Sequence, residues 1–75
     1  MELVLYQRDD CHLCDQALAV LAAAQVPVLE SVFIDDDERL EGRYGLRVPV
    51  LADGRGRELD WPFTAEAVRH WLQPG

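Results

Sequence analysis

The chain contains no lysine, few cysteines and no long apolar run. Its seven basic residues are all arginine, and with fourteen acidic residues they leave a net charge of -7 over 75 residues. Such a chain lacks the basic surface that nucleic-acid-binding proteins use to neutralise phosphates, so we expect no nucleic-acid partner. The longest apolar run, 17–24, is far shorter than the roughly 20 residues of a membrane-spanning helix. We therefore expect no membrane partner either.

The N-terminal segment lacks the cationic start and the cleavage pattern of a secretory signal. The sequence therefore predicts a cytoplasmic protein, in a compartment that keeps thiols reduced. Hydrophobic residues make up 49% of the chain, which favours a packed globule over disorder. At this length we expect one domain spanning residues 1–75.

The only two cysteines are Cys11 and Cys14, so at most one intramolecular disulfide can form. Its loop is too short to restrict the unfolded chain much, which makes a purely structural disulfide a poor interpretation. A structural zinc ion needs four ligands, and His12 and His70 are the only histidines that could complete the set. Because neither is well placed, we expect no metal site.

Hydrophobic periodicity predicts a strand, a helix and a second strand in the first half of the chain. The continuous apolar run 3–6 is typical of a central strand covered on both faces. A helix over 13–25, ended by Pro27, would bury one stripe, formed by Leu13, Ala17, Val20, Leu21 and Ala24. The β-branched segment 28–34 predicts the second strand, parallel to the first.

The second half predicts a short helix, a hairpin and a last helix. The acidic run 35–38 begins the short helix, with Leu40 and Tyr44 as its apolar contacts and Gly45 in the left-handed position at its end. A strand over 48–51, the turn signal Asp53-Gly54 and a return strand at 58–59 form the hairpin. Thr64 caps the last helix, whose buried stripe is Ala65, Val68, Trp71 and Leu72, and Pro74-Gly75 ends the chain.

The predicted order is therefore β-α-β-α-β-β-α. Two parallel strands followed by a hairpin indicate an α/β fold with one four-stranded mixed sheet and helices on both faces. Within this order the two cysteines open the first helix, directly after the first strand. A Cys-x-x-Cys motif at that place in a βαβ unit is a redox signature. Cys11, at the helix N-terminus, is the predicted nucleophile, and Cys14 is the predicted resolving thiol.

Charged residues around the motif leave alternatives open. A protonated His12 would stabilise the Cys11 thiolate, or His12 is an exposed loop residue without effect. Arg39, Arg43 and Arg47 fall four residues apart and either receive a substrate carboxylate or pair with Glu38 and Glu41. The run 35–38 lacks the spacing of a calcium-binding loop, which favours a helix start.

Four stretches together resemble the glutaredoxin-type form of the thioredoxin fold, and in particular a bacterial group of glutaredoxin-like proteins. They are Leu5-Tyr6, the 11–15 motif with its cysteines, the segment 44–50 with Val48-Pro49, and Trp61-Pro62-Phe63. The resemblance implies a cis peptide bond before Pro49, beside Cys11, and antiparallel pairing of the Val48 backbone with the substrate. It also implies that Arg8 lies near the position where glutaredoxins carry a basic residue ahead of the motif.

The chain departs from glutaredoxins where glutathione binds. Those proteins have Pro-Tyr between the cysteines and a Gly-Gly pair after the last strand, where this chain has His12-Leu13 and the segment 59–62 with Trp61. The bulky replacement weighs against glutathione use, although Thr64 at the following helix start offers N–H groups to a carboxylate. Glutathione therefore stays a candidate co-substrate.

The sequence thus predicts a thiol–disulfide oxidoreductase that requires no cofactor. Its partners would be a disulfide-bearing protein or a low-molecular-weight thiol, with an unidentified reductase as electron donor. The predicted substrate-binding residues are Val48, Pro49, Arg8, Arg47 and Thr64. Two alternatives stay open: a carrier of soft metals such as copper or zinc, and a non-catalytic module that binds a protein or holds an iron–sulfur cluster through Cys11.

Overall fold

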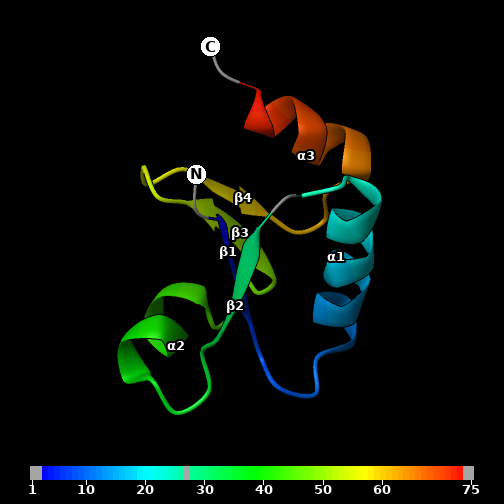
Figure 1. The fold of residues 1–75 in the computed structure, drawn as a ribbon. Coiled ribbons are helices and arrows are strands. Elements are labelled where there is room, and N and C mark those ends of the chain that lie inside the picture. Colours follow the sequence, from blue (N-terminus) through cyan, green and yellow to red (C-terminus); the bar gives the residue numbers. More distant parts are fainter. Residues whose placement is uncertain (1–2, 27, 74–75) are drawn as a thin grey trace.

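Strand β1 (Leu3–Gln7) lies inside a four-stranded sheet whose strand order is β2-β1-β3-β4 (Figure 1). The structure is a computed structural model that describes residues 3–26 and 28–73. Strand β2 (Leu29–Phe33) runs parallel to β1, whereas β3 (Val50–Asp53) runs antiparallel to it. Strand β4 (Glu58–Asp60) pairs antiparallel with β3 at the other edge. The predicted mixed sheet is confirmed.

Helices cover both faces of this sheet, as predicted (Figure 1). Helix α1 (His12–Ala23) and helix α3 (Ala65–Leu72) lie on one face, and helix α2 (Glu38–Tyr44) lies on the other. The order β-α-β-α-β-β-α is therefore confirmed. No helix in 3–26 or 28–73 is both long enough and apolar enough to cross a membrane.

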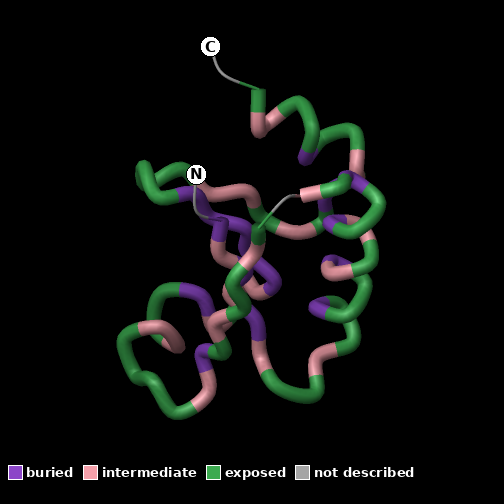
Figure 2. Tube along the Cα trace, viewed as in Figure 1, coloured by how far each residue is buried: buried purple, intermediate pink, exposed green. Residues whose placement is uncertain are grey.

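Each face of the sheet has its own hydrophobic core, because side chains alternate along a strand. Under α1 and α3 the buried residues are Leu3, Leu5, Ala17, Leu21, Ala24, Leu51, Phe63 and Val68. Under α2 they are Ile34, Tyr44 and Val50, with Tyr6, Leu40 and Val48 packed against them. The buried stretches follow the central strands and the inward turns of α1 (Figure 2). The first strand is thus covered on both faces, as its composition predicts.

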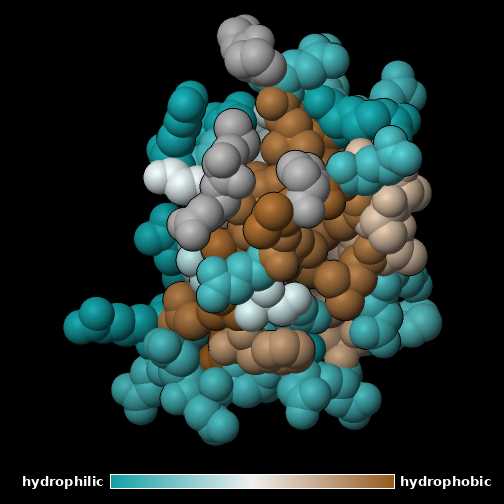
Figure 3. Space-filling model, viewed as in Figure 1, coloured by the Kyte–Doolittle hydropathy of each residue, from teal (hydrophilic) through white to brown (hydrophobic). Residues whose placement is uncertain are grey.

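Strand β2 is less covered than a central strand. It forms an edge of the sheet. Phe33, at its end, is 50% exposed, and Val28, just before it, is 66% exposed. Figure 3 views the molecule from the same side as Figure 1 and shows apolar side chains gathered in the middle, with hydrophilic residues around them. The β-branched composition of 28–34 predicts the strand correctly but does not reveal that it lies at an edge.

The predicted buried stripe of α1 is wrong at its first position. Leu13 is 46% exposed, and Cys14 is buried instead, together with Ala17, Leu21 and Ala24. The helix begins at His12, with Cys11 as its N-cap. Cys14 lies three residues before Ala17 and seven before Leu21, so it too falls on the buried stripe. The helix ends at Ala23, two residues earlier than predicted, and the role assigned to Pro27 lies outside the described residues.

Gly45 does end α2, but not in the predicted left-handed conformation. Its φ of -53° and ψ of -36° are right-handed helical values, which any residue can adopt. The requirement for glycine is steric, since a Cβ at this position would collide with the backbone carbonyl of Glu41. Asp37 caps the start of the same helix by accepting hydrogen bonds from the backbone N–H groups of Arg39 and Leu40 at 3.0 and 3.1 Å.

The second half of the chain forms the predicted hairpin with shifted boundaries. Strand β3 begins at Val50, so Val48 and Pro49 precede the strand instead of opening it. In the turn, the glycine with positive φ is Gly56, at 87°, and the buried Asp53 accepts hydrogen bonds from the N–H groups of Arg55 and Arg57 at 2.8 and 3.0 Å. The prediction that Pro74-Gly75 ends the chain after the last helix concerns residues outside those described.

Candidate active site

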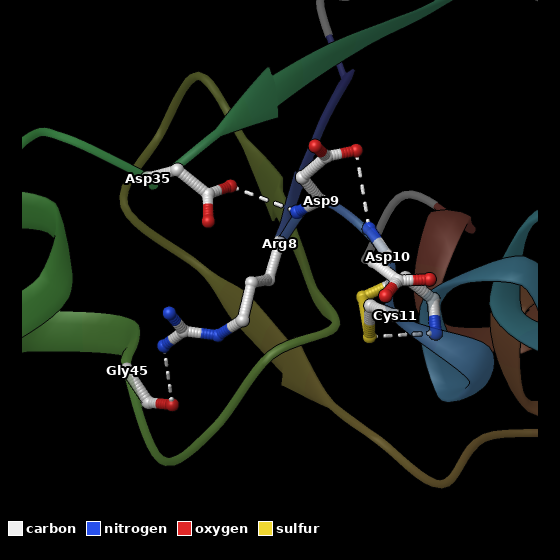
Figure 4. The surroundings of a disulfide bond; sticks show 7 residues. Arg8, Asp9, Asp10, Cys11, Asp35 and Gly45 are labelled. Atoms are coloured by element: carbon white, nitrogen blue, oxygen red, sulfur yellow. Dashed lines mark hydrogen bonds between the residues drawn. A yellow bond between two sulfur atoms is a disulfide. The ribbon is translucent and has the colours of Figure 1, made fainter.

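Cys11 and Cys14 form a disulfide at the N-terminus of α1 (Figure 4). Their Cα atoms lie 5.2 Å apart. Cys11 is the N-cap residue, with an extended backbone, and its Sγ accepts a hydrogen bond from the backbone N–H of Cys14 at 3.1 Å. The same N–H would stabilise negative charge on Sγ once the disulfide is reduced, as would the helix dipole.

The two sulfur-bearing residues differ in accessibility. Cys14 is 1% exposed and packs toward the sheet, whereas Cys11 is half-buried and lies in the loop before the helix. Only Cys11 can therefore meet a large reactant from solvent. This asymmetry suits the predicted roles of an attacking Cys11 and a resolving Cys14.

The register of the sheet brings Pro49 to the same end as the disulfide loop. Tyr6 pairs with Val50 between β1 and β3, so one step further Pro49 lies at the level of Gln7, where the chain leaves β1 toward Cys11. The cis peptide bond between Val48 and Pro49 is confirmed. The loop with the disulfide and the segment with the cis proline are thus neighbouring parts of one sheet end.

A second cis peptide bond, between Trp61 and Pro62, was not predicted. The backbone N–H of Trp61 donates to the carbonyl of Pro49 at 3.3 Å, which links the two proline segments. The Trp61 ring packs against the core under α1 and α3 and meets Phe63 edge-on, with ring centroids 5.0 Å apart. Nothing in the local sequence beyond the proline itself signals this bond, since most X–Pro bonds are trans.

The backbone of Val48 is only partly available for the predicted substrate pairing. Its N–H donates to the carbonyl of Tyr44 at 2.9 Å, and the N–H of Arg47 donates to the same oxygen at 2.8 Å. An antiparallel partner would use both the N–H and the C=O of Val48. In this structure the N–H is engaged within the chain, so we expect the carbonyl to be the group that meets a substrate.

Arg8 turns away from the disulfide. Figure 4 shows its side chain extending toward Gly45, whose carbonyl accepts a hydrogen bond from Nη2 at 3.1 Å. Both terminal nitrogens also donate to the carboxylate of Glu41, at 2.6 and 2.7 Å. The role of Arg8 in substrate binding stays a prediction, but its charge is already compensated by α2.

Arg47 is held by strand β4. It forms ion pairs with Glu58 and Asp60, each at 2.7 Å, and Arg43 reaches Glu58 at 3.3 Å. The predicted pairing of this arginine stripe with Glu38 and Glu41 is wrong for Arg43 and Arg47, because Glu41 pairs with Arg8 and their acidic partners lie in strand β4. Hydrogen bonds to Asp60 and Glu58 raise the pKa of Arg47.

Glu58 is a residue beside the cis-proline segment whose contacts sequence reasoning missed. It accepts hydrogen bonds from the Tyr44 hydroxyl at 2.6 Å and from Arg47, and these contacts lower the pKa of its carboxyl. Burial, followed by the bond to Glu58, raises the pKa of the Tyr44 hydroxyl. No spacing in the sequence signals these contacts, because Glu58 lies fourteen positions from Tyr44.

His12 and Thr64 lie at two helix starts and are both exposed. A ring nitrogen of His12 lies 3.0 Å from the side-chain nitrogen of Gln16, so its polar contact is within α1. The Thr64 hydroxyl accepts a hydrogen bond from the N–H of Ala67 at 3.0 Å, which confirms Thr64 as the cap of α3. Their roles toward thiolate and substrate stay predictions.

Acidic side chains border the disulfide loop. Asp35, after β2, accepts a hydrogen bond from the backbone N–H of Asp9 at 2.8 Å, and Asp9 in turn accepts one from the N–H of Asp10 at 3.1 Å. Figure 4 shows this chain of contacts leading to Cys11. Among the described residues, no three His, Cys, Asp or Glu side chains converge in an arrangement that would hold a metal ion.

A groove lies elsewhere, between β4 and α3. Its volume is about 600 Å³, and it is lined by Leu59, Thr64, Glu66, Ala67, His70 and Trp71. Neither cysteine contributes to it, so the groove and the disulfide are separate features.

Known proteins resemble the chain over nearly its whole length. The model of the glutaredoxin-like domain family (DUF836) matches residues 2–73. The X-ray structure of the structural-genomics target protein XcR50 from X. campestris is 67% identical, with a TM-score of 0.91 over 93% of each chain. The solution structure of XcR50 gives a TM-score of 0.89 at 67% identity, over 96% of this chain and 92% of that one.

A structure of lower sequence identity has the same fold as the two XcR50 structures. The solution NMR structure of protein Ne2328 from Nitrosomonas europaea is 35% identical, with a TM-score of 0.79 over 96% of this chain and 91% of that one. No curated protein matches the chain.

Proposed function

The chain belongs to the glutaredoxin-like domain family and has its thioredoxin-like fold, and from this premise we propose that it is a dithiol–disulfide oxidoreductase. The observation that carries the proposal is the unequal exposure of the two cysteines at one helix N-terminus. Cys11 is only half-buried and receives an N–H hydrogen bond on its sulfur, whereas Cys14 is buried one turn behind it. This arrangement supports one attacking and one resolving thiol.

In the proposed reaction the reduced protein donates two electrons to a disulfide. The Cys11 thiolate attacks one sulfur of the substrate, forming a mixed disulfide and releasing the other sulfur as a thiolate. The Cys14 thiolate then attacks the Cys11 sulfur, which closes the intramolecular disulfide and releases the second substrate thiolate. Both released thiolates take up protons, and an external dithiol reductant returns the protein to its reduced form.

The proposed reaction runs on thiols alone and requires no resident cofactor. Its substrate is a disulfide-bearing protein or a low-molecular-weight disulfide, and Val48 and Pro49 form the wall beside Cys11. We place the reaction in the cytoplasm, where thiols are kept reduced. Arg8 and Arg47, the arginines that would receive the carboxylates of glutathione, are both paired within the chain, which supports a preference for protein disulfides.

The test of this proposal is the trapping of a mixed disulfide. Cys14→Ser should accumulate a covalent adduct between Cys11 and a disulfide-bearing peptide, visible as an added mass that a reductant removes. Cys11→Ser should form none. Absence of the adduct in Cys14→Ser, together with no Cys11–Cys14 disulfide in a redox titration of the wild type, would refute the proposal.

Two further measurements separate the alternatives. Reduction of a peptide disulfide should be faster than reduction of a glutathione mixed disulfide, and the reverse ranking would make glutathione the main co-substrate. Stoichiometric, thiol-dependent binding of copper or zinc without disulfide exchange would instead support a soft-metal carrier.

A further inference from the structure

We propose that Glu58 is a positioning residue, which holds the segment Arg47–Pro49 in place for a disulfide-bearing polypeptide that docks beside Cys11. The inference rests on the proposed function and adds a residue from β4 to its substrate site. Glu58 lies outside the Cys-x-x-Cys motif and outside the cis-proline segment, so its influence would act through other residues.

Three donors converge on the Glu58 carboxylate. They are the Tyr44 hydroxyl at 2.6 Å, the Arg47 guanidinium at 2.7 Å and the Arg43 guanidinium at 3.3 Å. The Glu58 side chain is only 18% exposed, so these contacts replace most of its hydration. Hydrogen bonds with a charged group in such a position contribute more than those of an exposed ion pair.

Tyr44 connects the Glu58 carboxylate to the backbone of the segment. Its ring is buried, stacked on Tyr6 with centroids 4.1 Å apart, and the Arg47 guanidinium lies 5.2 Å from the ring centroid. The carbonyl of Tyr44 accepts the N–H groups of both Arg47 and Val48. Glu58 thus holds Arg47 directly and Val48 through Tyr44.

The segment is also attached to the other end of β4. Asp60 accepts two hydrogen bonds from Arg47, at 3.2 and 2.7 Å, and the N–H of Trp61 donates to the carbonyl of Pro49 at 3.3 Å. The segment before β3 is therefore fastened at Arg47, Val48 and Pro49. A polypeptide that pairs along a segment already fixed loses less free energy to ordering than one that must order it.

A small alkylating reagent reaches Cys11 without lying along this segment. The two reactions therefore report on different features: peptide turnover depends on the segment, and alkylation depends on Cys11 alone. We expect Glu58→Gln to raise the KM for a disulfide-bearing peptide about fivefold or more. The kcat and the rate of Cys11 alkylation by iodoacetamide should both stay within about twofold of the wild type, because Cys11 itself is unchanged.

Glu30→Gln is the matched control, since Glu30 is an exposed glutamate in the other edge strand, β2. It makes the same change of charge and should leave KM unchanged. Arg47→Ala should raise KM as well, and the double variant Arg47→Ala/Glu58→Gln should be no worse than the more affected single variant if both act through one contact.

The outcomes separate this inference from the proposed function. A wild-type protein without peptide turnover would refute both. Turnover in the wild type with an unchanged KM in Glu58→Gln would refute the positioning role alone. A loss of turnover in Glu58→Gln that is matched by equal losses in alkylation rate and unfolding midpoint would also refute it, because the residue would then be merely structural.

Discussion

Arg8 and Glu41 form an ion pair with two contacts, of 2.6 and 2.7 Å, between the chain just ahead of the disulfide loop and helix α2. The pair raises the pKa of Arg8 and lowers that of Glu41 through their side-chain hydrogen bonds. Arg8 also donates to the carbonyl of Gly45. The guanidinium therefore joins the two segments that lead into the site, at Cys11 and at Pro49.

Replacing Arg8 should change stability more than recognition of an anionic disulfide. We expect Arg8→Ala to lower the free energy of unfolding only modestly, because both partners are partly solvated. Arg8→Lys should lower the free energy of unfolding by a smaller amount, since a lysine keeps the charge but cannot make the two-point contact. Urea denaturation measures both. A large rise in the KM for a glutathione mixed disulfide at unchanged stability would show instead that Arg8 binds substrate.

Gly45 and Gly42 should respond in opposite directions to alanine, although they lie three residues apart. At Gly45 the added Cβ collides with the carbonyl of Glu41, so we expect Gly45→Ala to destabilise the protein by about 1–3 kcal/mol. At Gly42, inside α2, nothing lies within 4 Å of the added Cβ.

Gly42→Ala is therefore the matched control and should stabilise the protein by about 0.5–1 kcal/mol, as alanine favours a helix more than glycine does. Denaturation midpoints of the two variants test this directly. Equal effects at the two positions would contradict the steric explanation.

The two cysteines of the reduced protein should differ in reactivity toward a thiol reagent. Cys11 is half-buried and its sulfur accepts a backbone hydrogen bond, whereas Cys14 is 1% exposed. We expect iodoacetamide to modify Cys11 about tenfold faster or more, as measured by mass spectrometry of the digested protein. Under unfolding concentrations of urea the two rates should converge, and faster labelling of Cys14 in the folded protein would reverse the assigned roles.

Acid should destabilise the fold through three paired carboxylates. The pKa values of Glu41, Asp53 and Glu58 are lowered, mainly by Arg8, by Arg57 and by Tyr44 with Arg47, respectively. A lowered pKa in the folded state means that the unfolded chain binds protons first, so stability falls as the pH drops below about 4. Urea denaturation between pH 7 and pH 3 measures the loss.

Glu58→Gln should make this dependence on pH shallower, because one of the three carboxylates is gone. A substitution of Arg57 would test the Asp53 carboxylate in the same way, because Arg57 donates to Asp53 at 2.7 Å. Arg57 also lies 4.7 Å from the centroid of the Trp71 ring. An unfolding free energy that is equal at pH 3 and pH 7 would contradict the assigned ion pairs.

Local sequence patterns were sufficient to predict the features that a few consecutive residues define. The apolar run of β1, the cap at Thr64 and the Cys-x-x-Cys motif at the start of α1 are each visible within a few consecutive residues, and each was placed correctly. The cis bond before Pro49 came from family resemblance and not from spacing. The error at Leu13 arose because Leu13 and Cys14 are both spaced to meet the stripe, and hydrophobicity alone favours the leucine over the cysteine.

The sequence by itself determined the order of elements and the pair of thiols, because both follow from periodicity and from chemistry within one turn of helix. Only the tertiary structure decided which of fourteen acidic residues Arg8, Arg43 and Arg47 meet. Arg8 pairs with Glu41, and Arg47 with Glu58 and Asp60, across distances along the chain that no spacing rule specifies. Those pairings hold the segments on either side of the disulfide, and they exist only once the sheet has brought its strands together.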